Sequence, residues 1–257
     1  MTYLLLQTFT YGTSVEPQLL ESFKLRQLAN VSDGVMMMGY EMNRKRHGVK
    51  GVAASQAGPN APLFNVTGCC YGIDHAMKFY FEQGIPASKI WLGIPWYGKV
   101  YECQAPPFAP APTFGTCGSA DPYGFGRTVL PYCGIRDYMR SIVSCSSQNL
   151  SCFNASSSAA NGRCVRKWNE QGASPFLDCW KTDPATKTNT TTQVWYDDPE
   201  STAAKCGWAR KRGLGGVGVW LGDALFDEFG HQADAKMWDA LKIPVDVRAM
   251  KADDSSA

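Results

Sequence analysis

Val31-Ser-Asp-Gly-Val-Met-Met-Met-Gly-Tyr40 is the stretch that decides the fold, and Lys89-Ile-Trp-Leu-Gly-Ile-Pro-Trp-Tyr-Gly98 has the same character further along the chain. Both are continuous apolar runs bounded by turn residues, a pattern typical of strands that are covered on both faces. Between them, Tyr71–Gln83 places apolar residues at helical spacing, and Gly84 favours the end of that helix. The sequence therefore predicts a strand, a helix and a second strand, which implies a parallel sheet and an α/β fold.

A further unit of this kind follows near the carboxyl end. Asp198 is a good N-cap, Pro199 suits the first helical position, and Gly213 favours the helix end. The apolar run Leu214–Leu221 then predicts a third buried strand, and Gln232–Leu241 predicts a final helix. The alternation of helix and strand is thus expected on both sides of a long central region.

The central region, residues 101–192, interrupts this alternation. It contains a Pro-rich segment (Ala105–Pro112), a Thr-rich segment (Thr182–Thr192) and most of the cysteines, with little periodicity. We therefore expect an inserted Cys-rich subdomain, after which the short segment Gln193–Asp197 forms a strand that re-enters the main fold. The expected domains are residues 1–100 for the first part of the α/β fold, 101–192 for the insertion, 193–245 for the return to that fold, and 246–257 for a polar tail.

Cysteines and asparagines indicate the compartment. Seven of the ten cysteines lie between Cys103 and Cys179, and none forms a C-x-x-C pair, so disulfides are favoured over a zinc ribbon or a thioredoxin-type site. Five of the nine asparagines begin an N-x-[S/T] acceptor for glycosylation, which we expect on surface loops. A secreted or lysosomal protein is implied. The five are Asn30, Asn65, Asn149, Asn154 and Asn189.

Charge and hydropathy exclude several classes of partner. The 257 residues carry 25 Lys and Arg against 23 Asp and Glu, so the net charge is only +2. Such a balance gives no strong field for nucleic acid or an anionic membrane. The longest apolar runs have the length of strands and fall far short of the roughly 20 residues of a membrane helix. We therefore expect a neutral ligand, no nucleic acid and no membrane span.

No cofactor or metal is expected either. Gly213-Leu-Gly-Gly-Val-Gly218 matches the G-x-G-x-x-G of dinucleotide sites, but it follows a predicted helix and leads into a strand, the reverse of that motif's context. A helix end followed by a tightly packed strand explains these glycines. The three histidines, His47, His75 and His231, have neither metal-ligand spacing nor a nucleophile motif around them.

Three segments together resemble the family 18 glycoside hydrolases, the chitinase group, and among them the di-N-acetylchitobiase branch. Met38-Gly-Tyr-Glu41 is similar to the Met-x-Tyr-Asp at the end of the family's sixth barrel strand. Ile90–Gly98 resembles strand seven, and Gln193–Trp220 resembles the helix and strand eight, with an insertion between strands seven and eight as in that family. The order of the three segments makes the resemblance specific over about residues 31–242.

The resemblance implies a fold and a site. The fold is a (β/α)8 TIM barrel, of which this chain would supply strands six to eight, with a remnant of strand five in Tyr3–Tyr11 and the Cys-rich insertion. Function in such barrels lies at the carboxyl ends of the strands. The expected ligand is an N-acetylglucosamine oligosaccharide (chitin fragments or the chitobiose core of N-glycans), and the full-length protein is expected to be a monomer. The expected substrate-binding residues are Tyr40, Glu41, Trp96, Tyr97 and Trp220.

The family's mechanism is substrate-assisted, because the acetamido oxygen of the sugar attacks the anomeric carbon while a glutamic acid protonates the leaving oxygen. By analogy, Tyr40 would hold the acetamido group, Glu41 would orient the sugar, and Trp220 would be its stacking floor. Asp197 and Asp198 are weaker candidates for substrate contact, since helix capping already explains Asp198.

The acid itself is missing from the sequence. The family's acid ends the motif D-G-x-D-x-D-x-E on strand four, and this chain has no Asp-x-Asp anywhere. Only 34 residues precede Val35, where five strand-helix units at about 30 residues each would need far more. We therefore expect a chain truncated at its amino end, without a signal peptide and inactive alone. Two alternatives stay open: a sugar-binding lectin of the same fold, and a disulfide-rich structural or interaction protein.

Overall fold

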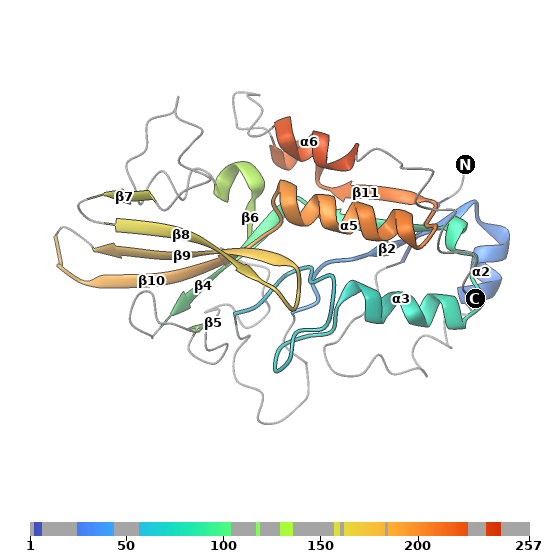
Figure 1. The fold of residues 1–257 in the computed structure, drawn as a ribbon, viewed down its shortest axis with the longest axis horizontal. Helices are drawn as coiled ribbons and strands as arrows, with labels where there is room; N and C mark the ends of the chain where they lie inside the picture. The colour runs from blue at the N-terminus through green and yellow to red at the C-terminus, as the bar shows by residue number, and fades with distance from the viewer. Residues whose placement is uncertain are drawn as a thin grey trace.

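The structure is a computed structural model. It describes residues 3–6, 25–43, 57–103, 117–118, 129–135, 157–159, 162–182, 185–225 and 235–242. Two sheets and the helices beside them account for most of these residues (Figure 1).

The first sheet is parallel and has four strands in the order β1-β2-β3-β11. Their bounds are β1 Tyr3–Leu6, β2 Gly34–Met38, β3 Ile90–Pro95 and β11 Gly216–Trp220. The register aligns the carboxyl end of each strand with that of its neighbour, Met38 beside Gly93 and Trp220 beside Pro95. The predicted parallel sheet is therefore confirmed, and its carboxyl ends meet at one edge.

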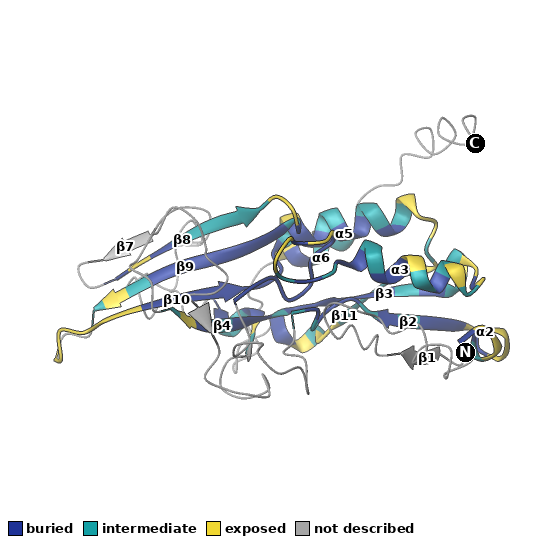
Figure 2. Cartoon of the chain, turned by 90° about the horizontal axis from the view of Figure 1, so that it is seen from below, coloured by how far each residue is buried: buried dark blue, intermediate teal, exposed yellow. Residues whose placement is uncertain are grey.

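Helices connect and cover this sheet. Helix α3 (Ile73–Glu82) lies between β2 and β3 along the chain, as the apolar spacing predicted. Helix α5 (Pro199–Lys211) precedes β11, and α6 (Ala235–Leu241) follows it. Figure 2 shows α3 and α5 on the same side of the parallel strands. Helix α2 (Leu25–Val31) and two short 3-10 turns, η1 (Ala87–Lys89) and η3 (Gly222–Leu225), were not predicted.

The ends of α5 follow the predicted signals. The Asp198 carboxylate accepts a hydrogen bond from the Ser201 backbone N–H at 3.0 Å, and the Ser201 hydroxyl oxygen accepts one from the Asp198 N–H at 3.0 Å. This reciprocal capping box satisfies two backbone donors that the helix itself leaves without partners. Gly213 takes a φ of +68° just past the C-cap Arg212, a conformation that glycine adopts without a steric penalty.

The second sheet is antiparallel, with the order β5-β4-β10-β9-β8-β7 and β6 paired to β4. It extends away from the helices, toward the left of Figure 1. Its bounds are β4 Tyr97–Cys103, β5 Cys117–Gly118, β6 Val129–Pro131, β7 Ser157–Ala159, β8 Gly162–Asn169, β9 Ser174–Thr182 and β10 Asn189–Trp195.

The strands of this sheet correct two expectations. Tyr97 and Gly98, expected to extend the parallel strand, instead begin β4 after the chain turns at Trp96. Segment 193–195, expected to return to the main fold, belongs to β10, which pairs with β9 and β4 of the antiparallel sheet. The Thr-rich segment lacked apolar alternation, yet β-branched threonines suit strands when partners on both sides complete their hydrogen bonds.

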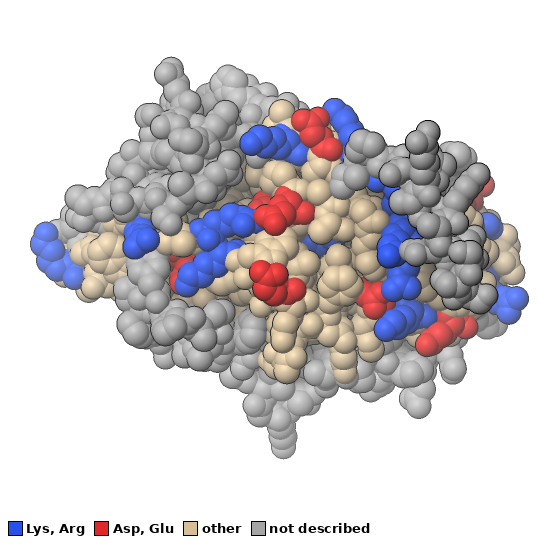
Figure 3. Space-filling model, viewed as in Figure 1, with Lys and Arg blue, Asp and Glu red and all other residues tan. Residues whose placement is uncertain are grey.

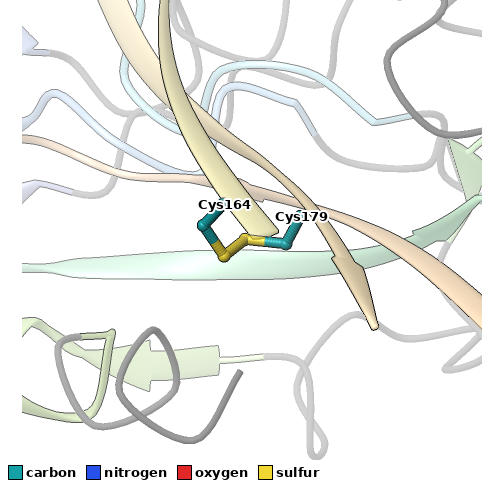
Figure 4. Close-up of a disulfide and its surroundings, with 2 residues drawn as sticks. All are labelled: Cys164 and Cys179. Atoms are coloured by element: carbon teal, nitrogen blue, oxygen red, sulfur yellow. A yellow bond between two sulfur atoms is a disulfide. The ribbon is translucent and has the colours of Figure 1, made fainter. Parts of the chain in front are cut away.

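A disulfide joins β8 to β9 within this sheet. Cys164 and Cys179 lie directly opposite each other in the register of the two strands and are covalently paired (Figure 4). Cys103 is also disulfide-bonded. Cys145 and Cys152, which the sequence placed in the same disulfide-rich region, lie outside the described residues.

Two large apolar cores and one small cluster support the sheets in the described residues, and Figure 2 shows the buried strands in dark blue. One core lies between the parallel strands and helices α2, α3 and α5, and includes Met37, Ile73, Ile90 and Leu92. The other lies between β9, β10 and α6, and includes Leu177, Val194 and Met237. Among the described residues, none of the helices has the length and apolar character that crossing a membrane requires.

Charged side chains are mixed on the face shown in Figure 3, where basic and acidic groups lie next to one another. Arg166 on β8 pairs with Asp198 and Glu200 at the start of α5, each at 2.7 Å. Lys167 pairs with Asp178 on β9 at 2.7 Å. This mixture matches the near-zero net charge and gives this face no field of a single sign.

Candidate functional site

Two neighbouring strand ends bring the first group of predicted residues together. Tyr40 and Glu41 follow β2 at its carboxyl end, and Tyr97 begins β4 just after β3 ends. The Tyr97 hydroxyl donates to Glu41 Oε1 at 2.7 Å, and Lys99 Nζ donates to Glu41 Oε2 at 2.7 Å. The rings of Tyr40 and Tyr97 meet edge to face, with centroids 6.0 Å apart. Three of the five predicted residues therefore form one cluster, and each oxygen of the Glu41 carboxylate has its own donor.

The backbone at Glu41 is held in an uncommon conformation. Its φ is +62°, which costs a residue with a Cβ about 1 kcal/mol or more. Asn60 opposes this cost, because its side-chain Oδ1 accepts a hydrogen bond from the Glu41 backbone N–H at 3.2 Å. Backbone strain of this kind is concentrated at functional sites, where the surrounding structure has to hold it in place.

Two glycines make room for the cluster. A Cβ on Gly39 would lie 2.6 Å from Leu92 Cδ1 and 2.8 Å from the Gly93 carbonyl oxygen, so only glycine lets the chain pass so close to β3. A Cβ on Gly93 would lie 3.3 Å from Cε1 of Tyr40, which shows that the Tyr40 ring packs over this position. Gly39 and Gly93 thus let the chain after β2 pass close to β3, with the Tyr40 ring over Gly93.

Burial raises the pKa of both tyrosines of the cluster. Burial and the neighbouring Glu41 carboxylate raise the pKa of Tyr40 to about 12. Burial first, and then Glu41, raise the pKa of Tyr97 well above its ordinary value. Loss of a proton would place a second negative charge beside Glu41 in a poorly solvated position. Both hydroxyls therefore remain hydrogen-bond donors throughout the physiological pH range.

Trp220 lies at the carboxyl end of β11, one strand beyond β3. Its side chain is 47% exposed, unusual for so large an apolar group. Its carbonyl oxygen accepts a hydrogen bond from the Trp96 N–H at 2.7 Å, which ties the end of β11 to the turn that follows β3. Trp220 is thus an exposed aromatic surface at the same edge of the parallel sheet as Tyr40 and Glu41.

The structure places Trp96 elsewhere. Its side chain has no exposed surface and packs edge to face on Trp238 of α6, with ring centroids 4.7 Å apart. Side chains buried this way contribute to packing, and this arrangement leaves no Trp96 surface for a ligand.

The two aspartates before α5 are also committed to the fold. Asp197 is 2% exposed and is bound by the ammonium group of Lys205 and, at 2.6 Å, by the Ser201 hydroxyl. Asp198 caps α5 and pairs with Arg166. Neither side chain is available as a substrate contact in this arrangement.

Sequence reasoning missed two members of the cluster. Lys99 is 4% exposed in β4, and a lysine is almost never so buried unless it is paired with an acid. Nothing in the sequence indicated this burial, because Lys99 follows the apolar run and β4 also carries Glu102. Asn60 offers no signal either, since it lies in an irregular segment 19 residues from Glu41. Only the fold brings Asn60 and Glu41 together.

The predicted glycosylation asparagines have mixed surroundings. Asn65 is exposed, and its Oδ1 accepts a hydrogen bond from the Gly72 N–H at 2.9 Å. Asn189 is exposed at the start of β10. Asn30 is exposed in the last turn of α2, so it lies on a helix and not on the expected loop. Asn149 and Asn154 lie outside the described residues.

Two curated proteins similar to this chain are named as a di-N-acetylchitobiase and a probable di-N-acetylchitobiase. The chain is 28% identical over 177 residues to di-N-acetylchitobiase of Mus musculus, covering 63% of this chain and 39% of that protein. It is 29% identical over 222 residues to the probable di-N-acetylchitobiase 2 of Dictyostelium discoideum, covering 83% of this chain and 49% of that protein. The chain thus spans half the length, or less, of these relatives.

Solved structures and a family model point the same way. The crystal structure of a Group IV chitinase from Ostrinia furnacalis matches 93% of this chain and 56% of its own chain, with a TM-score of 0.63 and 18% identity. At this identity the likeness shows the fold alone. The family model for glycosyl hydrolases family 18 matches residues 4–224. Because this match extends over most of the chain, the protein belongs to glycosyl hydrolases family 18, as its three motifs predicted.

Proposed function

We propose that this chain is the sugar-binding half of a family 18 glycosidase that cleaves β-1,4 linkages of N-acetylglucosamine, in chitin oligosaccharides or in the chitobiose core of N-glycans. The observation that carries the proposal is the Glu41 carboxylate, held by Tyr97 and Lys99 beside Tyr40. Trp220 lies exposed at the same edge of the sheet. The names of the di-N-acetylchitobiase relatives support the choice of substrate.

In this proposal the four parallel strands are strands five to eight of a (β/α)8 barrel. The order β1-β2-β3-β11, with a helix before β3 and another before β11, supports that assignment. The antiparallel sheet formed between β3 and α5 is then the insertion that follows strand seven. Barrels of this kind place their function at the carboxyl ends of the strands, where the Glu41 cluster lies.

The cluster suits a substrate-assisted retaining reaction. The acetamido oxygen of the sugar attacks its own anomeric carbon, so the protein has to position that group and stabilise the charge that develops on it. Tyr40 is suited to hydrogen-bond the acetamido group because its hydroxyl is a protonated donor in the cluster that Glu41 and Tyr97 form. The hydroxyl of Tyr97 already donates to Glu41, so Tyr97 acts by fixing the carboxylate.

Glu41 and Trp220 would contact the rest of the bound sugar. The Glu41 carboxylate, fixed by two donors at 2.7 Å, would accept hydrogen bonds from the bound sugar and orient it. Trp220 would stack against the apolar face of the sugar ring. Protonation of the leaving oxygen needs a carboxylic acid with a raised pKa, and the Asp-x-Asp-x-Glu motif that carries it in this family is absent from the sequence.

The experiment compares this chain with an extended chain that includes the acid-bearing strand. The substrate is a chitobioside that releases a chromophore. We expect turnover only in the extended protein, and Tyr40→Phe should lower its kcat by about 100-fold with little change in KM, because one transition-state hydrogen bond is lost. Tyr80→Phe is the matched control, since it removes a tyrosine hydroxyl from helix α3, which carries no predicted site residue.

Two results would contradict this proposal. Comparable turnover by the 257-residue chain, abolished by Glu41→Gln, would show that the acid is present here and has been misassigned. Tight binding of chitooligosaccharides by the extended protein without any turnover would identify a lectin. The same proposal places the protein in the lysosome or outside the cell. A glycan on Asn65 or Asn189 in protein produced by animal cells would support this location.

A further inference from the structure

Two adjacent cysteines lie in a tight turn that the proposed reaction does not use. The turn, Val66–Cys70, is closed by a hydrogen bond from the Val66 N–H to the Cys70 carbonyl at 2.9 Å and another from the Cys70 N–H to the Val66 carbonyl at 3.2 Å. Gly68 allows this shape, since its φ is +76°. Cys69 and Cys70 are free thiols in the structure.

The turn brings the two sulfur atoms together. Sγ of Cys69 lies 2.8 Å from Sγ of Cys70. Disulfide sulfurs are about 2.04 Å apart, so a shift of less than about 1 Å would bring these two to bonding distance. Adjacent residues often direct their side chains to opposite sides, as in a strand. The turn has instead placed the two thiols side by side.

The two thiols differ in accessibility. Cys70 is 7% exposed, whereas Cys69 is half-buried. The hydrogen bond with Cys69, followed by burial, raises the pKa of the Cys70 thiol well above its usual value. An external oxidant therefore reaches Cys69 first, and Cys70 is the partner that completes the reaction.

We propose that Cys69 and Cys70 form a reversible vicinal disulfide, a small ring that includes their shared peptide bond. The oxidant is a small-molecule disulfide such as oxidised glutathione. The Cys69 thiolate attacks one of its sulfurs, which forms a mixed disulfide and releases one thiolate. Cys70 then gives its proton to solvent and attacks Cys69 Sγ, which forms the ring and expels the second thiolate. Two protein thiols are oxidised and one disulfide is reduced to two thiols.

The ring should be easier to reduce than the disulfide in the antiparallel sheet. Consecutive Cα atoms are about 3.8 Å apart. This is less than the 4.1 Å between the Cα atoms of Cys164 and Cys179, so the ring is the more strained and more reducible of the two bonds. Cys164 and Cys179 are instead held opposite each other by two fully paired strands. A pair that is strained, partly exposed and local in sequence has the features of a reversible thiol switch.

The turn also lies against the support of the Glu41 cluster. A Cβ on Gly58 would lie 2.5 Å from Cys69 Sγ and 2.8 Å from Asn43 Nδ2, so this glycine lets the turn and Asn43 approach each other. Asn60, two residues on, holds the backbone of Glu41. The chemistry of the turn stands independently of the proposed glycosidase activity, which none of the following measurements uses.

Peptide mapping of the full chain tests the proposal. Trypsin releases residues 51–78, which contain no cysteine besides this pair, and enzymatic deglycosylation removes any sugar on Asn65. For protein equilibrated with oxidised glutathione and then alkylated without reduction, we expect this peptide to carry no alkyl group and to be two hydrogen atoms lighter than the dithiol. After reduction it should take up two alkyl groups. Two alkyl groups without prior reduction, or a cross-link to a different cysteine peptide, would overturn the proposal.

A variant and a titration test the order and the reversibility. In Cys70→Ser the resolving thiol is gone, so the same oxidant should leave a stable mixed disulfide on Cys69; an unmodified Cys69 would refute the assigned order of attack. In a titration with reduced glutathione, the 51–78 peptide should regain its two thiols before the Cys164–Cys179 pair does. Reduction of both pairs together would show that the ring is not the labile bond that we propose.

Discussion

Lys205→Met should destabilise this protein more than its position on a helix suggests. Lys205 has no exposed surface, and its ammonium group binds the Asp197 carboxylate, which is itself 2% exposed. Methionine has nearly the same length and volume, so the substitution removes the charge and leaves the packing of α5 in place. Asp197 would then keep only the hydrogen bond from Ser201.

The expected cost is that of an unpaired buried charge. Removing one partner of a buried ion pair costs about 3–5 kcal/mol in the free energy of unfolding. For a chain of this size, each kcal/mol lowers Tm by roughly 2–4 °C, so Tm should fall by about 6–20 °C. The double variant Asp197→Asn, Lys205→Met removes both charges and should recover most of the loss.

The loss should also depend on pH. Burial already raises the pKa of Asp197 in the folded protein, and Lys205 is the main influence that lowers it. Without Lys205 that pKa rises further, and an acid whose folded-state pKa is raised destabilises the folded state as the pH rises through it. The defect of Lys205→Met is therefore greatest at neutral pH and shrinks as the pH falls toward the ordinary value of an aspartate, about 4.

Urea unfolding followed by tryptophan fluorescence provides the measurement, at neutral pH and near pH 5. Lys242→Met is the matched control, because Lys242 pairs with Asp239 at 3.0 Å while both side chains remain mostly exposed. That change should cost less than about 1 kcal/mol. If the two lysine variants were equally stable, or if the Lys205→Met defect did not diminish at lower pH, the assignment of a buried ion pair would be wrong.

Three further predictions follow from the same structure. Gly207→Ala should stabilise α5 by about 0.5–1 kcal/mol, because a Cβ there meets no atom within 4 Å. Gly213→Ala should instead cost about 1 kcal/mol, because the φ of Gly213 is +68°. If urea unfolding showed that both changes shift the free energy of unfolding in the same direction, this argument would be wrong. Replacing Cys164 and Cys179 together by Ala should lower stability by about 3 kcal/mol for a sequence separation of 15, and calorimetry showing no change in Tm would refute this estimate. In the chain extended to include the acid-bearing strand, Trp220→Ala should weaken chitooligosaccharide binding at least about tenfold with little change in Tm. The control Trp168→Ala on β8 should leave the affinity unchanged. If calorimetric titration found the same affinity for both variants, Trp220 would not belong to the site.

Features that depend on interactions between residues close in sequence could be predicted without the fold. The helix end signals at Asp198, Pro199 and Gly213 act within a few residues, so they were readable without the fold, and the capping box and the positive φ bear them out. The apolar runs around Met37 and Ile94 predicted buried parallel strands, since their length and continuity need a cover on both faces. The family, too, followed from three short motifs in order, and the match over residues 4–224 confirms it.

Pairing between distant segments was decided only by the tertiary structure. The strand signal of threonines near β10 is weak, because such strands become stable only when neighbours on both sides complete their hydrogen bonds. The prediction for Trp96 failed for a similar reason. Its position beside Tyr97 in the sequence suggested a shared role in the site, but the chain turns between β3 and β4, and the two side chains lie in different surroundings.

The Glu41 cluster shows the physical reason for this division. The sequence identified Tyr40, Glu41 and Tyr97, because residues at the ends of parallel strands share one edge of the sheet. It did not identify Lys99 or Asn60, which hold the carboxylate and the backbone of Glu41 from 58 and 19 residues away. A motif records which groups the chemistry needs, whereas the partners that fix a charge and a strained backbone are selected by proximity in space, which only the packed fold determines.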